Sequence, residues 1–159
     1  MTSTDTDGVQ RSYLASEENF QTLRAYEMNN LLVPLVGDFG GGKTLRSVGR
    51  YLAAHRATVT LFYTSNVEQY LFQGGDQWRR FFDNLAALPT NDDSTLLRSY
   101  FNMGGASVRR VPQLGSRSRF TRSGMLLDSI PDLLDSVRRG AVRSYYDVIE
   151  HSSTLQPVF

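Results

Sequence analysis

The residues with the clearest chemical potential form a glycine-rich turn. The spacing Gly37-x-x-x-x-Gly42-Lys43-Thr44 matches the P-loop pattern letter for letter. In a P-loop, backbone N–H groups surround a phosphate, the lysine contacts its outer oxygens and the threonine hydroxyl binds magnesium. One hypothesis is therefore a nucleotide-binding protein that uses Gly37, Gly42, Lys43 and Thr44.

Several features of the sequence argue against this hypothesis. Asp38 and Phe39 place an acidic and a bulky side chain inside the turn, where an anion would have to approach the backbone. A P-loop also usually follows the first strand of its domain and needs a second acid for the metal, for which Asp128 is the late candidate. In the alternative interpretation, Asp38 caps the helix that follows or accepts hydrogen bonds from a polar ligand.

A second group of polar residues follows the next apolar segment. Ser65 and Asn66 are typical helix N-cap residues, and Glu68 comes directly after them. In an α/β sheet, ligands bind beyond the carboxyl ends of the strands. The candidate substrate-binding set is therefore Asp38, Phe39, Ser65, Asn66 and Glu68, for a small molecule that the sequence does not identify.

The elements that must position these residues alternate along the chain. Apolar and β-branched runs predict strands over 31–36, 57–65, 94–101 and 124–130. Helical spacing predicts helices over 16–29, 44–55, 75–88 and from Pro131 to Gly140, with a short helix beginning at 66. The first of these helices is expected to bury one stripe. This alternation predicts an α/β fold with a mostly parallel sheet flanked by helices.

The composition is that of one soluble globular domain. The chain has 159 residues and a formal net charge of +1, so it carries no overall attraction for polyanions. It has no cysteine, which excludes disulfides and thiolate metal sites, and its two histidines provide little material for a metal centre or a Ser-His-Asp triad. We predict no metal site, no membrane segment and a cytoplasmic location.

Two parts of the chain differ from the rest. Residues 1–14 read as a flexible lead-in to a single α/β domain over 15–159. Residues 102–123 read as a mobile insertion that is rich in arginine and contains no acidic residue. A clamp for phosphate or nucleic acid is the alternative, but the insertion lacks the interleaved aromatic residues that base stacking requires, so nucleic acid is not the expected partner.

The segments GVQRSYLASEENF, ATVTLFYTSNVEQYLFQ and STLLRSYFN, together with the VPLVGDF turn, carry a resemblance over most of Gly8–Asn102. They resemble an uncharacterised bacterial family with a predicted class I methyltransferase-like, Rossmann-like fold. SNVEQYLF is the most distinctive block, and GAVRSYYDVI extends the resemblance loosely. The family's turn commonly reads Gly-Asp-Phe-Ala-Gly-Pro-Lys, which implies that Gly42 and Thr44 produce the P-loop match by drift.

The resemblance also implies a partial Rossmann-like sheet, with Leu31–Val36 as the fourth strand and 57–63 as the fifth. Relatives hold S-adenosylmethionine with an N-terminal portion to which no segment here corresponds, so this chain alone would bind no cofactor. The open edge of a central strand would then seek a homodimer or a partner chain. Three hypotheses remain: a methyltransferase-like domain that is inactive alone or acts with a partner, a P-loop protein, and a non-enzymatic interaction module.

Overall fold

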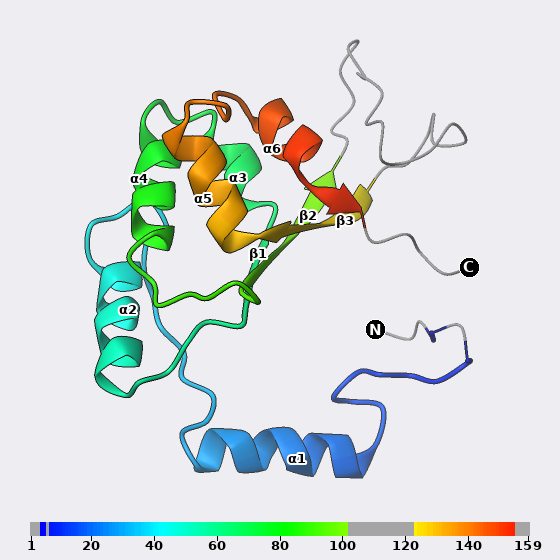
Figure 1. Cartoon of the computed structure of the whole chain (residues 1–159). Coiled ribbons are helices and arrows are strands. Elements are labelled where there is room, and N and C mark those ends of the chain that lie inside the picture. The colour runs from blue at the N-terminus through cyan, green and yellow to red at the C-terminus, as the bar shows by residue number, and fades with distance from the viewer. Residues whose placement is uncertain (1–3, 6, 102–122, 155–159) are drawn as a thin grey trace. The chain divides into compact units, whose positions relative to one another are not determined.

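The computed structural model describes residues 4–5, 7–101 and 123–154 (Figure 1). The described residues up to Val36 form one unit, and those from Gly37 onward form a second unit. Nearly all of the arginine-rich insertion predicted at 102–123 lies outside the described residues.

The first unit contains helix α1 (Glu17–Met28), which begins as predicted. The Ser16 hydroxyl accepts a hydrogen bond of 3.1 Å from the Asn19 amide and so caps the helix. The expected buried stripe is wrong, because no residue of α1 is buried and Phe20 and Tyr26 are exposed. Helical spacing marks an apolar face, but the face is buried only where another element packs on it.

The strand predicted over Leu31–Val36 is also wrong, because the structure has no strand there. Its apolar side chains are exposed, and Pro34 has no amide to donate to a ladder. An apolar composition is compatible with a buried strand, but a strand forms only where another strand satisfies its backbone groups.

The second unit is built on a sheet with the order β1-β2-β3-β4. Its strands are β1 (Leu61–Ser65), β2 (Thr95–Phe101), β3 (Ser123–Ser129) and the two-residue β4 (Ser153–Thr154). β1 and β2 are parallel, whereas β3 runs antiparallel to both β2 and β4. The sheet is therefore mixed rather than mostly parallel. Hydrophobic patterns locate strands but carry no information about their direction.

In the part of the chain that the structure describes, five helices accompany this sheet, and four of them were predicted. They are α2 (Thr44–Ala54), α3 (Val67–Leu71), α4 (Gln77–Leu85), α5 (Ile130–Arg138) and α6 (Tyr145–His151). The sequence analysis missed α6, whose start carries a reciprocal capping box between Ser144 and Asp147. Two backbone amides and a hydroxyl donate to the Asp147 carboxylate, and these bonds lower its pKa against the effect of burial. Among the described helices, none has the length and apolar character needed to cross a bilayer.

The two faces of the sheet have different environments. Figure 1 shows α3, α4, α5 and α6 on one side of the strands. On that side, Leu96 packs in a core with Phe81, Leu85 and Leu133. Alternation and register place a second set of side chains on the opposite face, which we call the open face. It consists of Leu61, Tyr63, Leu97, Phe101, Met125 and Leu127.

Candidate functional site

Hydrogen bonds between its own residues hold the glycine-rich turn in shape. The Asp38 carboxylate accepts a hydrogen bond of 2.9 Å from the Gly40 amide, and the Asp38 carbonyl accepts one of 3.1 Å from the Gly41 amide. Asp38 therefore caps the turn rather than α2, whose N-cap residue Lys43 makes no side-chain capping bond. A side chain at Gly37 would lie 2.1 Å from the Thr44 hydroxyl oxygen, so this close approach requires glycine.

The rest of the turn is attached to the core. The Phe39 ring lies 6.3 Å from the Phe62 ring and 6.2 Å from the Phe81 ring, measured between centroids. The buried Asn84 amide donates to the carbonyls of Phe39 (2.9 Å) and Gly41 (2.7 Å). A phosphate cradle needs free amides that point outward. In this turn Asp38 engages the amides of Gly40 and Gly41, and the Phe39 ring packs inward.

The residues predicted at the end of β1 and directly after it do not join this turn in one site. Ser65 has a φ of 51° and sits at a register shift in β1, and Asn66 precedes α3 without a side-chain capping bond. Glu68 is 1% exposed and is directed into the core. No described contact joins Glu68 to Asp38 or Phe39. The structure thus places Glu68 in a different site, which the sequence analysis did not anticipate.

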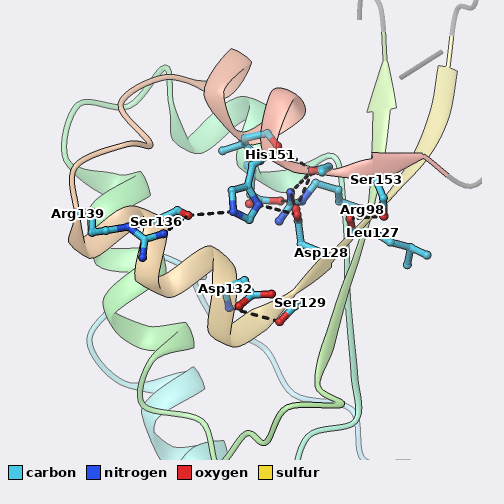
Figure 2. Close-up of polar contacts among 12 residues, drawn as sticks. Arg98, Leu127, Asp128, Ser129, Asp132, Ser136, Arg139, His151 and Ser153 are labelled. Atoms are coloured by element: carbon cyan, nitrogen blue, oxygen red, sulfur yellow. Dashed lines mark hydrogen bonds and ion pairs between the residues drawn. The ribbon is translucent and has the colours of Figure 1, made fainter. Parts of the chain in front are cut away.

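That site is a buried polar network, which we call the Arg98 cluster (Figure 2). Arg98 lies on β2, with its Nε atom 2.7 Å from Glu68 Oε2. Its Nη1 atom bonds Asp128 Oδ2 on β3 and donates to the Ser152 hydroxyl at 2.8 Å. The guanidinium-bearing side chain is 1% exposed and both carboxylate side chains are 2% exposed. We use this name for the six residues Glu68, Arg98, Asp128, Ser136, His151 and Ser152.

The charges of this cluster do not balance around Arg98, since one guanidinium serves two buried carboxylates. Burial raises the pKa of Glu68, the neighbouring Asp128 raises it further, and Arg98 opposes both effects. Glu68 Oε1, Arg98 Nη2 and the Tyr145 hydroxyl have no hydrogen-bond partner among the described residues. Burial also raises the pKa of Tyr145, which favours its neutral form. Both shifts therefore favour the uncharged forms of Glu68 and Tyr145 in the core.

His151 links the cluster to the surface. Its Nδ1 atom lies 2.9 Å from Asp128 Oδ1, and its Nε2 atom lies 2.9 Å from the Ser136 hydroxyl on α5. The Arg139 guanidinium donates to the same hydroxyl at 3.2 Å. The His151 side chain is 28% exposed, in contrast to the buried Asp128.

The sequence analysis missed this arrangement. It considered Asp128 as a metal ligand for the glycine-rich turn, but the side-chain partners of Asp128 are Arg98, His151 and Ser152. The signal in the sequence that could have pointed to this site was the His151-Ser152 dipeptide, which follows an amphipathic segment. Within the described part of the chain, no three potential metal ligands of the His, Cys, Asp and Glu types gather in one place.

Comparison with known families gives one match. The profile of a domain of unknown function, DUF7790, matches residues 1–120, so the chain belongs to this family. A search of curated proteins finds no significant match. The family description assigns no activity and does not indicate a methyltransferase-type fold.

Proposed function

We propose that the chain is an interaction module that joins a second copy of itself along the free edge of β1. The observation that carries this proposal is the pairing of β1, which bonds β2 on one side while no described strand bonds its other side. An unpaired edge presents N–H and C=O groups that a further strand can satisfy.

The residues of β1 support pairing at this edge. Its sequence, Leu-Phe-Tyr-Thr-Ser, contains none of the charged or proline residues that protect free edges in stable monomers. Leu61 and Tyr63 of the open face are 55% and 53% exposed. A strand that pairs with the free edge of β1 would therefore gain both backbone hydrogen bonds and apolar contacts with Leu61 and Tyr63.

A two-fold axis at the centre of β1 would make the contact self-complementary. The two copies of β1 would then run antiparallel, with Tyr63 opposite the same residue of the second copy. Tyr63 is already oriented by a contact of 3.3 Å between its hydroxyl and that of Ser99, which lowers its pKa. Facing aromatic residues are among the favourable cross-strand pairs.

From the resemblance of the segments we also propose that the completed sheet is methyltransferase-like. This finer proposal assigns no reaction step to the residues of this chain. Because the glycine-rich turn is bonded to itself, this chain would contribute structure rather than a donor site. The residues proposed to bind a substrate, which is itself unidentified, remain Asp38, Phe39, Ser65 and Asn66.

Light scattering coupled to gel filtration tests the proposed contact. We expect a species of twice 17.9 kDa for the native chain and a monomer for Tyr63→Lys, which places like charges opposite each other. Tyr63→Phe and Tyr51→Lys should remain dimeric, since the first keeps the ring and the second changes an exposed position on α2. A native chain that stays monomeric at millimolar concentration, or a dimer that tolerates Tyr63→Lys, would overturn the proposal.

A further inference from the structure

We infer that Ser136 is a nucleophile activated by His151 and Asp128, and that it accepts acyl groups from small carboxylic esters. The three side chains are connected in the order hydroxyl, imidazole and carboxylate (Figure 2). The two distances are 2.9 Å each, and the two ring nitrogens serve different partners. This is the constellation by which serine hydrolases are recognised on unrelated folds.

The hydrogen bonds determine the direction of the relay. An ionised Asp128 can only accept, so the Nδ1 atom of His151 must carry a proton and donate it. In a neutral imidazole the Nε2 atom is then an acceptor, and the Ser136 hydroxyl must donate to it. A serine that donates to a neutral imidazole has its general base in place.

The remaining contacts of Asp128 hold it in this role. Its Oδ2 atom accepts from Ser152 at 2.7 Å and bonds Arg98, which leaves Oδ1 for His151. Two partners thus hold Asp128 at its Oδ2 atom, while Oδ1 orients the imidazole, as second-sphere partners fix other catalytic groups.

Arg139 provides the positive charge that this reaction needs. Ser136 lies inside helix α5, and a helical serine has its own amide in the ladder rather than in an oxyanion hole. The exposed Arg139 places a guanidinium nitrogen 3.2 Å from the Ser136 oxygen, where it would stabilise the negative charge that this oxygen gains as its proton passes to His151. Because Ser136 is only 5% exposed, the acyl group must be small and must enter beside His151.

The proposed step conserves atoms and charge. The Ser136 oxygen bonds the ester carbonyl carbon while its proton passes to His151 Nε2, and the ester C–O bond breaks as His151 protonates the departing alcohol. Water then attacks the acyl-serine, its proton passes to Nε2, and Ser136 recovers a proton as the carboxylic acid leaves.

Helix α2 contains a matched control. Ser47 accepts a hydrogen bond of 2.9 Å from Arg50, three residues later, just as Ser136 accepts from Arg139. His55 follows the opposite end of α2, and its ring bonds the Tyr51 carbonyl. A serine beside an arginine in a helix is therefore present twice, but only Ser136 is joined to a histidine and a carboxylate in the described structure.

Labelling with a fluorophosphonate probe, mapped by mass spectrometry, tests the inference on the native chain. We expect the label on Ser136, no label there in Ser136→Ala, and a rate at least about 100-fold lower in His151→Gln. Ser47→Ala should label at the native rate. Circular dichroism and thermal melting establish that each variant is folded. Mapping the labelled residue on the native chain tests the inference without any variant. A folded native chain unlabelled at Ser136, or His151→Gln labelled at the native rate, would overturn the inference.

Discussion

Replacing Arg98 with methionine tests whether one guanidinium keeps two carboxylates buried. The substitution retains an unbranched, apolar side chain but leaves Glu68 and Asp128 without their shared cation, in a region where all three side chains are at most 2% exposed. Removing one partner of a buried ion pair is strongly destabilising, because the remaining charge is uncompensated.

The expected loss is about 3–5 kcal/mol of unfolding free energy at pH 7. For a chain of this size, that corresponds to a decrease in Tm of roughly 6–20 °C. Glu68 adds a pH dependence, since burial raises its pKa in the folded state above the ordinary value of 4.5. A raised carboxyl pKa favours the protonated folded state, so stability is lost as the pH rises above 4.5 towards the folded-state pKa.

Urea unfolding followed by circular dichroism, at pH 7 and pH 5, measures both effects. We expect the deficit of Arg98→Met to be smaller at pH 5, and Glu68→Gln, which cannot ionise, to gain on the native chain between pH 5 and pH 7. The double variant Glu68→Gln/Arg98→Met should recover part of the loss. A deficit under about 1 kcal/mol at pH 7 would refute the reasoning, because it would match an exposed ion pair. So would an equal deficit at both pH values.

Three further predictions concern the glycine-rich turn and its surroundings. Gly49→Ala should cost about 1–3 kcal/mol in urea unfolding, because the new carbon would lie 2.5 Å from the Ala87 carbonyl oxygen; Gly42→Ala, which meets nothing within 4 Å, should stay within about 0.5 kcal/mol. Asn84→Ala should cost about 1–3 kcal/mol, since its amide bonds the turn's carbonyls from a buried position; an unchanged midpoint would contradict this. Millimolar Mg-ATP should leave the Tm unchanged, whereas a rise that Lys43→Ala abolishes would establish a nucleotide site.

Several elements were predictable because their signals are local. Ser16 caps α1 through an amide three residues away, and Pro131 and Gly140 bracket α5 as expected. The amphipathic segment around Trp78 forms α4 and provides much of the core. Spacing and capping act within one or two turns, so they can be recognised without knowledge of the fold.

The candidate site was less predictable, because its signals are not local. Glu68 was selected as a polar residue at a strand end, but its burial depends on the docking of α3 against β2. Asp128 was noticed for a role beside the glycine-rich turn, whereas its partners lie on β2 and at the end of α6. Arg98 occurs in an apolar strand without any pattern that identifies its partners.

The sequence by itself determined where most helices and strands occur and that thiol chemistry is excluded. Only the tertiary structure decided that Leu31–Val36 is not a strand, that β3 is antiparallel, and that His151 joins Asp128 to Ser136. The physical reason is that helix caps and hydrophobic periods depend on neighbours in the chain. Strand partners and buried polar contacts depend instead on residues that are distant in sequence and are brought together by packing.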